Sequence, residues 1–302
     1  MQNEDADDRL DCLVVGGGPG GLTAAVYLGR YLRKVVVVDA GESRLRSIPK
    51  TRNMIGFPDG VPGRELHDRL QAHVDHYPVE RLAGRIERIE RLEDGSFEAG
   101  LNGRRLRARK VLLATGARDV EPDVPGLAEG LQCGQVRYCP VCDGYETRGQ
   151  RVAVLGREIR GLREALFVAG FDNHVTWLSM GSQEAVAASD LARLRAAGVR
   201  IADQAPRQVL CRPGRDVVID LLEGPTLVFD VLYPALGLVH VSDLAITLGA
   251  GVAKDGHLIV DAHLQTTVPG LYAAGDVAAG LNQISVAAGH AAIAATAIHN
   301  AL

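Results

Sequence analysis

The chain has 302 residues, which is too long for one ordinary hydrophobic core and suits two domains of about 100 to 200 residues each. Hydrophobic residues make up 47% of it and charged residues 23%, and its 35 glycines indicate many tight backbone turns in a globular protein. The formal net charge is −4, and the arginines are scattered along the sequence. These features exclude the basic patch that a nucleic-acid partner would require.

The N-terminal segment, MQNEDADDRLDC, is acidic and polar, whereas a signal peptide begins basic and continues apolar. No apolar run approaches the ~18 residues of a membrane-spanning helix. We therefore expect a cytoplasmic protein with no membrane partner. The five cysteines form an odd set, which argues against a structural disulfide framework; they are Cys12, Cys133, Cys139, Cys142 and Cys211.

The first predicted elements form a βαβ unit. An apolar run at 11–15 ends in the glycine-rich segment GGGPGG, and a helical pattern at 22–32 and a β-branched run at 35–38 follow. Residues 84–113 alternate apolar and charged positions around Asp94-Gly95 and Asn102-Gly103, which predicts a β-meander with tight turns.

A second βαβ unit follows about 140 residues later in the chain, a separation typical of a second domain. It comprises a strand at 151–155, a helical stretch at 162–169 and a strand at 175–178. Another strand pattern at 271–277 belongs with the first unit, so the first domain is expected to be discontinuous. We predict an α/β fold with two Rossmann-like dinucleotide-binding domains of three-layer ββα type, the second inserted into the first. The predicted domains are 1–117 with 242–302, and 118–241.

The first glycine loop has the spacing of a dinucleotide site. Gly16, Gly18 and Gly21 follow a strand and open a helix, so backbone N–H groups and the helix dipole are available to a pyrophosphate. Asp39, at the end of the next strand, suits a ribose hydroxyl and would repel a 2′-phosphate. This pattern favours FAD or NAD over NADP.

Two further segments favour FAD. ATGA at 114–117 and YAAGDV at 272–277 each follow a strand, and both resemble signatures of flavoproteins with two dinucleotide-binding domains. Asp276, before a helical stretch at 287–301, is similar to an aspartate that binds the ribityl chain of FAD, although an aspartate near a helix N-terminus is also a common cap. The candidate FAD residues from these segments are Thr115, Gly116, Gly275 and Asp276.

Cys139-Pro-Val-Cys142 is a CxxC motif, which occurs in redox dithiols and in zinc sites. A zinc site needs a second ligand pair, and the sequence has no other CxxC and no HxxxH, so we predict a redox pair and no metal. Asp143 is the expected proton donor or acceptor for the dithiol, with a turn residue before Gly144 as the alternative.

These motifs, in this order along nearly the whole chain, resemble those of the low-molecular-weight thioredoxin reductases. The resemblance implies an FAD-dependent disulfide oxidoreductase that forms a homodimer with a mobile second domain. It also implies that Cys142 faces the flavin, that Cys139 attacks the disulfide of a thioredoxin-like partner and that Asp143 is the acid. Gln283 and Ile284 match residues near the flavin ring.

The NADPH loop departs from the family pattern. The second glycine of Gly-x-Gly is replaced by Glu158, whose carboxylate would obstruct and repel a pyrophosphate. The segment after the second strand, SMGSQE at 179–184, lacks the basic cluster that binds a 2′-phosphate. NADPH is therefore a doubtful cofactor. Arg157, Arg160 and Arg163 offer an unusual phosphate site, but a solvated helix face is the favoured interpretation.

His290 replaces an acidic residue of the family. It is interpreted as a neighbour of a helix cap, with a protonatable group near the flavin as the alternative.

Three mechanisms remain open, together with one non-catalytic alternative. The preferred one is a disulfide reductase fed by ferredoxin or another donor instead of NADPH. The second is a dithiol oxidase, which passes electrons from a small dithiol through Cys139 and Cys142 to FAD and oxygen; such enzymes usually carry His after the CxxC, so Asp143 favours the reductase. The third is a conventional NADPH-dependent thioredoxin reductase. A flavin sensor without turnover is disfavoured by the intact CxxCD motif.

Overall fold

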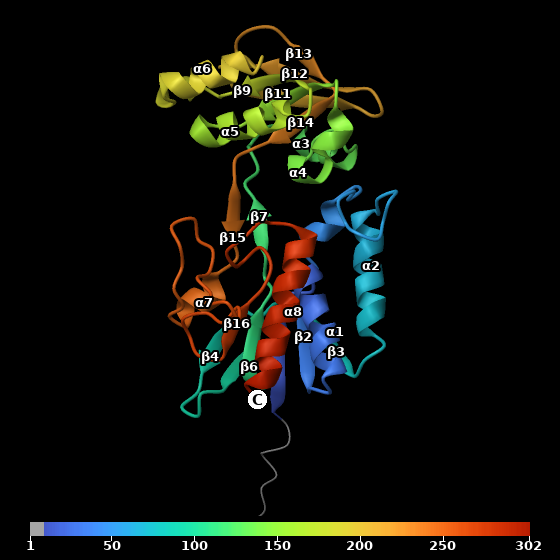
Figure 1. Cartoon of the computed structure of the whole chain (residues 1–302), viewed down its shortest axis with the longest axis vertical. Coiled ribbons are helices and arrows are strands. Elements are labelled where there is room, and N and C mark those ends of the chain that lie inside the picture. Colours follow the sequence, from blue (N-terminus) through green and yellow to red (C-terminus); the bar gives the residue numbers. More distant parts are fainter. Residues whose placement is uncertain (1–8) are drawn as a thin grey trace, which may run out of the picture. The chain divides into compact units, whose positions relative to one another are not determined.

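The computed structural model describes residues 9–302, which form two compact units (Figure 1). Unit 1 contains the chain up to Lys50 together with Val61–Arg118 and Val239–Leu302. Unit 2 contains Thr51–Gly60 and Asp119–Leu238. Where the chain passes into and out of the long segment of unit 2, β7 (Ala117–Asp119) and β15 (Leu238–His240) pair with each other.

Unit 1 contains strands from both ends of the chain around one large sheet. Its strands are β1 (Leu10–Val15), β2 (Val35–Asp39), β3 (Val79–Ala83), β4 (Ile89–Arg91), β5 (Phe97–Leu101), β6 (Arg104–Leu113) and β16 (Leu271–Ala273). Its helices are α1 (Pro19–Arg30), the 3-10 helix η1 (Arg44–Ser47), α2 (Gly63–Val74), α7 (Asp243–Thr247) and α8 (Ile284–Asn300).

The sheet of unit 1 combines a parallel part and an antiparallel part that share β6. Strands β3, β2, β1 and β6 run parallel in that order, and β16 pairs in parallel with the last residues of β6. The first residues of β6 instead pair antiparallel with β5, which pairs with β4. The parallel order places the carboxyl ends of β1, β2, β6 and β16 at one edge, where α/β sheets bind nucleotides.

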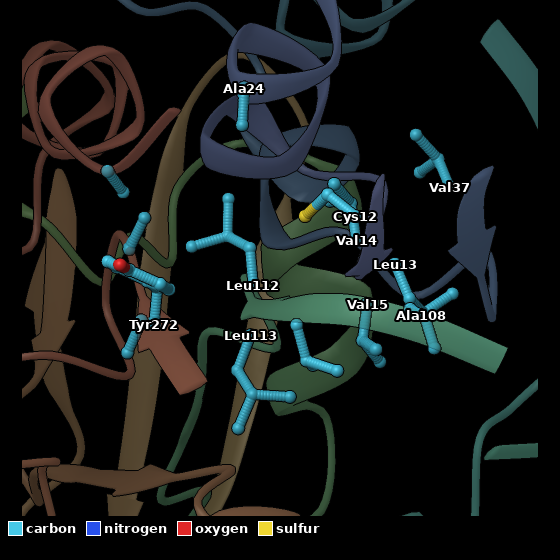
Figure 2. Close-up of a cluster of buried hydrophobic side chains, with 14 of the residues drawn as sticks. Cys12, Leu13, Val14, Val15, Ala24, Val37, Ala108, Leu112, Leu113 and Tyr272 are labelled. Carbon is cyan, nitrogen blue, oxygen red and sulfur yellow. The ribbon is translucent and has the colours of Figure 1, made fainter. Parts of the chain in front are cut away.

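The core of unit 1 follows from near-continuous apolar strands that are buried on both faces. Leu13, Val14 and Leu112 are completely inaccessible to solvent, and Cys12 lies among them (Figure 2). Burial raises the pKa of the Cys12 thiol, so this cysteine is an inert core residue. Helices α1 and α8 pack against each other, and most of their buried residues are alanines and glycines, whose small size allows a close approach.

Unit 2 contains the second βαβ module. Its strands are β8 (Arg151–Leu155), β9 (His174–Leu178), β10 (Arg200–Ala202), β11 (Pro206–Arg212), β12 (Asp216–Leu221), β13 (Leu227–Phe229) and β14 (Val231–Pro234). Its helices are α3 (Leu127–Gln132), α4 (Pro140–Asp143), α5 (Glu158–Ala169), α6 (Ala188–Ala196) and the 3-10 helices η2 (Gly144–Thr147) and η3 (Gln183–Ala185).

The parallel sheet of unit 2, in the order β10-β9-β8-β14, separates two apolar layers. Because side chains alternate across a strand, Val152 and Val154 of β8 pack with α5, whereas Ala153 and Leu155 pack with the antiparallel sheet β11-β12-β13. The unit is therefore a three-layer ββα arrangement.

The structure and the sequence-based domain boundaries differ for residues 51–60, which the sequence analysis placed in the first domain. In the structure this segment belongs to unit 2. Asn53 donates a hydrogen bond from Nδ2 to the carbonyl oxygen of Val141 (3.3 Å), and Arg52 lies 3.8 Å from a carboxylate oxygen of Glu146. Such contacts between residues far apart in sequence leave no local pattern.

Within residues 9–302, no helix combines the length and the apolar character needed to cross a membrane.

Candidate active site

The first glycine loop packs too closely for any side chain at two of its glycines. A Cβ on Gly16 would lie 2.2 Å from the carbonyl oxygen of Ala114, and Gly16 has a φ of +114°, in the left-handed region that favours glycine. A Cβ on Gly21 would lie 1.8 Å from the carbonyl oxygen of Gly16. At Gly18, the residue before α1, a Cβ would meet only the Ser43 hydroxyl at 3.3 Å. The loop thus has the tight turn and the open backbone that a pyrophosphate needs.

Asp39, at the carboxyl end of β2, is joined to this loop. Its Oδ1 accepts hydrogen bonds from the backbone N–H groups of Gly17 (3.2 Å) and Gly41 (3.0 Å). A residue absent from the sequence prediction, His67 on α2, donates from Nε2 to the carbonyl oxygen of Gly17 (2.9 Å) and is 1% exposed. Its Nδ1 is buried, and no group in residues 9–302 bonds to it.

The predicted FAD-binding residues that follow β6 and β16 lie at the same edge of the sheet. Thr115, after β6, donates from its hydroxyl to the carbonyl oxygen of Val241 (2.6 Å), and Gly116 accepts from the N–H of Val241 (3.0 Å). Gly275 follows β16 with a φ of +77°, and a Cβ there would meet Ala287 of α8 at 3.3 Å.

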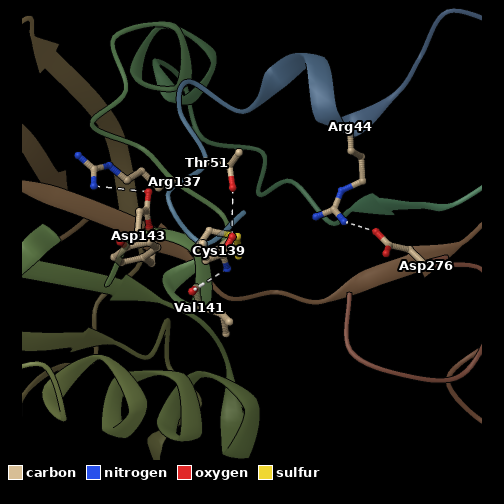
Figure 3. The surroundings of a disulfide bond; sticks show 10 residues. Arg44, Thr51, Arg137, Cys139, Val141, Asp143 and Asp276 are labelled. Atoms are coloured by element: carbon tan, nitrogen blue, oxygen red, sulfur yellow. Dashed lines mark hydrogen bonds and ion pairs between the residues drawn. A yellow bond between two sulfur atoms is a disulfide. The ribbon is translucent and has the colours of Figure 1, made fainter. Parts of the chain in front are cut away.

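Asp276 forms an ion pair with Arg44 of η1 at 2.8 Å (Figure 3). The sequence did not predict Arg44, because 232 residues separate the two partners.

Gln283 is the N-cap of α8 and Ile284 is its first residue. His290 lies well inside α8, so its interpretation as a neighbour of a helix cap is wrong. Its imidazole packs against Gly280, where a Cβ would lie 3.2 Å from Cε1. Its Nδ1 is buried, and no partner for it exists in the described chain. Burial lowers the pKa of His290, and the nearby Asp276 opposes this shift, so the ring is neutral at neutral pH.

Cys139 and Cys142 form a disulfide bond, with their Cα atoms 5.3 Å apart. Cys139 is the N-cap of the short helix α4, and Pro140 at the first helical position supplies the φ angle that a helix start requires. The N–H of Cys142 donates to the carbonyl oxygen of Cys139 (2.9 Å). The fold thus brings the CxxC sulfurs within bonding distance, as dithiol chemistry requires.

Asp143 belongs to a polar group that also contains Tyr233 and Arg137. The Tyr233 hydroxyl donates to Asp143 Oδ1 at 2.7 Å, and Arg137 Nη1 lies 3.5 Å from Oδ2 (Figure 3). Burial raises the pKa of the Asp143 carboxyl, and the Tyr233 hydrogen bond and the Arg137 charge offset part of that rise. A partly buried carboxyl of raised pKa next to a disulfide suits proton transfer to and from a thiolate.

Tyr233 is a partner that sequence reasoning missed. It is the one hydroxyl-bearing residue of β14 (VLYP), a strand that is otherwise apolar, and its side chain is completely inaccessible to solvent. Burial raises its pKa, so the phenol stays protonated and donates. The only available signal was this hydroxyl in a buried strand, because buried tyrosine hydroxyls usually have a hydrogen-bond partner.

The second glycine loop differs from the first at its centre. Glu158, in the place of the second glycine, has a φ of +50°, which an L-residue adopts at a cost of about 1 to 2 kcal/mol. Its backbone N–H donates to the hydroxyl of Ser182 at 2.7 Å, and that hydroxyl donates to the carbonyl oxygen of Ser179 at 2.6 Å. A side chain of this unit thus bonds the first N–H of α5, a group that a pyrophosphate would use.

The rest of this loop keeps the close packing of a dinucleotide fold. A Cβ on Gly161 would lie 2.3 Å from the carbonyl oxygen of Gly156, and Trp177 Nε1 donates to that oxygen at 2.7 Å. Arg157, the N-cap of α5, and Arg160 and Arg163 in its first turns are exposed, and the Arg160 guanidinium lies against the backbone of Gly237. The backbone frame is retained, whereas the centre of the cofactor loop is altered.

A family model described as pyridine nucleotide-disulphide oxidoreductase matches residues 10–291, which is most of the chain. The chain belongs to this family. The predictions of this oxidoreductase family, of FAD as cofactor and of two Rossmann-like domains are confirmed.

Similar solved structures agree in fold over the whole length. The thioredoxin reductase of Streptococcus pyogenes has a TM-score of 0.90 at 26% identity, with 98% of both chains covered. An oxidoreductase of Agrobacterium tumefaciens has a TM-score of 0.86 at 28% identity, covering 97% of this chain and 98% of that one. The predicted resemblance to thioredoxin reductases is confirmed at the level of fold.

Curated relatives are longer. An alkyl hydroperoxide reductase component from Pseudomonas putida is 33% identical, with 97% of this chain and 58% of that protein covered. A protein named NADH dehydrogenase from Bacillus subtilis is also 33% identical, with 95% of this chain and 58% of that protein covered. The chain thus spans little more than half the length of these relatives.

Proposed function

We propose that this enzyme transfers two electrons between a dithiol or disulfide substrate and FAD through Cys139 and Cys142, and that it does not accept hydride from NADPH. The proposal that NADPH is not a donor rests on the backbone conformation of Glu158. A glutamate in the left-handed region, with its N–H bonded to Ser182, leaves the cofactor loop without the bare glycine and the free N–H group of a pyrophosphate site.

The residues at the sheet edge of unit 1 fit FAD. The open backbone at Gly18 suits the pyrophosphate, and Asp39 suits a ribose, because its Oδ1 is oriented by two backbone N–H groups. Asp276, near the start of α8, suits the ribityl hydroxyls, and Arg44 orients its carboxylate. Bound FAD supplies a two-electron acceptor and donor for the dithiol.

We assign the proton and sulfur chemistry to three residues. Cys139 exchanges with the substrate disulfide, Cys142 is the flavin-side thiol, and Asp143 moves the proton that a thiol must lose or gain each time the disulfide opens or closes. In one cycle a substrate dithiol gives up two electrons and two protons and becomes a disulfide, or the reverse. Tyr233 and Arg137 position the Asp143 carboxyl for this transfer.

We further propose that the substrate is a thioredoxin-like protein or a small dithiol, in a homodimeric cytoplasmic enzyme. The thioredoxin reductase from S. pyogenes, similar over its full length, supports the first substrate class. With NADPH disfavoured, ferredoxin or another reduced protein is the proposed electron donor.

Anaerobic stopped-flow absorbance of the flavin band tests this proposal. Oxidised enzyme is mixed separately with NADPH, NADH and dithiothreitol. NADH is included because a relative of similar sequence is named NADH dehydrogenase. We expect dithiothreitol to bleach the flavin and NADPH to leave it oxidised. Rapid bleaching by NADPH would refute the altered-loop argument and restore a conventional thioredoxin reductase.

Two cysteine variants control the experiment. Cys142→Ser should slow bleaching by dithiothreitol by a factor on the order of 100 or more, the scale for loss of a catalytic nucleophile. Cys133→Ser, an exposed thiol of the same unit outside the disulfide, should behave as wild type. Equal bleaching of Cys142→Ser and wild type would indicate a flavin protein in which the disulfide has no role. Rapid reoxidation of the reduced enzyme by oxygen would favour the dithiol oxidase.

A further inference from the structure

A cluster of two histidines and one aspartate lies in unit 1, outside the residues assigned to the reaction. His240 is the last residue of β15, and Asp255 and His257 lie on a turn that follows α7. One potential ligand atom of each residue lies within 4.8 Å of those of the other two. In the part of the chain that the structure describes, this is the only group of three such side chains with that proximity.

The turn that carries Asp255 and His257 is well anchored. Val252 and Leu258 form an antiparallel bridge across it, and the N–H of Leu258 donates to the carbonyl oxygen of Val277 (2.8 Å). The Ser242 hydroxyl donates to the carbonyl oxygen of Gly256 (3.0 Å), which ties the turn to the residues that follow β15. The three side chains therefore converge from connected backbone.

The hydrogen bond of His240 defines which of its nitrogens is free. His240 Nδ1 lies 2.5 Å from the carbonyl oxygen of Asp276, and a carbonyl only accepts, so Nδ1 carries the proton. In the neutral ring, Nε2 then has a free lone pair. A histidine that donates its other N–H to a carbonyl is the usual arrangement of a metal ligand, because that bond fixes the tautomer and the ring orientation.

His257 and Asp255 form the second half of the cluster. His257 Nδ1 lies 2.6 Å from Asp255 Oδ1, and the His257 ring is perpendicular to that of His240, with centroids 5.9 Å apart. The Asp255 side chain is 58% exposed and that of His257 is 24% exposed, so both have room to adjust.

We propose that His240, Asp255 and His257 bind a divalent cation of the Zn²⁺ type, each through one atom, with water in a fourth position. Imidazole and carboxylate donors suit such borderline ions. Bonds of ~2.1 Å in a tetrahedral site require donors about 3.4 Å apart. The three atoms lie within 4.8 Å of one another in this structure, so metal binding requires the side chains of the exposed turn to rotate toward His240.

This site goes beyond the sequence analysis, which predicted no metal because it considered only CxxC and HxxxH spacings. Its position gives it a connection to the flavin-binding residues. The metal ligand His240 would bond, through its other nitrogen, to the backbone of Asp276, the residue proposed for the ribityl chain. The metal proposal itself does not depend on the proposed function.

To test the site, the FAD-loaded, tag-free full chain is first treated with a chelator and is then titrated with Co²⁺. Co²⁺ reports its coordination through visible absorption, and Zn²⁺ should displace it. We expect one ion per chain. His257→Ala should weaken Co²⁺ affinity by a factor of at least ~10 to 100. The matched control is His263→Ala, because His263 is exposed in the same unit and lies outside the cluster; this variant should bind as wild type does.

A wild-type chain that binds no Co²⁺, or a His257→Ala chain that binds it as tightly as wild type, would overturn the proposal. The flavin spectrum shows whether each variant is folded. If His257→Ala loses its flavin, Asp255→Asn replaces it, because Asp255 is exposed and asparagine keeps a side-chain oxygen that can accept the hydrogen bond from the backbone N–H of His257. That variant should also show weakened Co²⁺ binding, and unchanged binding would equally refute the site.

Discussion

Two neighbouring glycines at the start of α1 should respond in opposite ways to the same substitution. Gly20 and Gly21 are both buried residues of α1, where alanine is favoured over glycine by about 1 kcal/mol. A Cβ on Gly20 would lie 3.5 Å from the carbonyl oxygen of Ala274, which is an ordinary contact. A Cβ on Gly21 would lie 1.8 Å from the carbonyl oxygen of Gly16. The difference lies in packing alone, because the helical preference is the same at both positions.

The expected magnitudes follow from these distances. Gly20→Ala should raise the free energy of unfolding by ~0.5 to 1 kcal/mol. Gly21→Ala requires the loop to move away from α1 by more than ~1 Å, but Gly16 also packs against the backbone of Ala114 and cannot yield. Overpacking typically costs ~1 to 3 kcal/mol, and the rigid backbone contact places this case at the upper end. After the helical gain, Gly21→Ala should lose ~2 kcal/mol, so the two variants should differ by ~3 kcal/mol.

Urea denaturation of both variants, with flavin content per chain measured on the purified proteins, tests this reasoning. Gly20→Ala should retain its flavin, because that position faces Ala274 and Ala287, whereas Gly21→Ala should lose most of it, because the loop at Gly18 is displaced. A Gly21→Ala chain with wild-type stability and full flavin would show that the loop yields easily and would refute the rigidity argument.

Four further predictions concern unit 2. Glu158→Gly removes a left-handed glutamate and should raise the melting temperature, for a gain of up to ~1 kcal/mol after the entropy cost of glycine. Trp177→Phe leaves the buried carbonyl oxygen of Gly156 without its donor and should cost about 2 kcal/mol in urea denaturation. Tyr233→Phe removes a hydrogen bond that lowers the pKa of Asp143, so the limb of the pH–rate profile for dithiol oxidation that depends on this acid should move to higher pH. Burial raises the pKa of Asp143, so ionising this carboxyl destabilises the fold as the pH rises above 3.8, the ordinary pKa of aspartate. Asp143→Asn should therefore be more stable than wild type at neutral pH. This advantage should disappear below about pH 4, where the carboxyl is protonated in both the folded and the unfolded chain.

Much of the fold was predictable because its signals are local. The β-branched run at 35–38 and the apolar run at 151–155 correspond to β2 and β8, and the meander at 84–113 contains β4, β5 and β6. The glycine spacing also placed the loop at the edge of the sheet, since a strand, a glycine turn and a helix are consecutive in the chain. Strand periodicity and turn residues depend on near neighbours, which a single sequence contains.

The partners of the site residues were less accessible to sequence reasoning. Arg44 reaches Asp276 across 232 positions, and Tyr233 reaches Asp143 across 90. These contacts arise only when the strands have been ordered in a sheet. The assignment of His290 failed for a different reason: α8 begins at Ile284, three residues before the predicted helical stretch, so a position expected near the helix start lies well inside the helix. Boundaries of helices depend on capping contacts that composition does not specify.

The hydrogen bonds around Ser182 have an evolutionary consequence. The Ser182 hydroxyl stabilises the first N–H of α5, so replacing Glu158 by glycine would leave that N–H still bonded, and removing the hydroxyl alone would leave the glutamate still in place. Each single change is therefore expected to bring little gain in cofactor affinity, and the loss of the hydroxyl costs stability. Under the proposed function, in which NADPH is not a donor, pyridine nucleotide binding would need both changes together, and neither change alone provides the site.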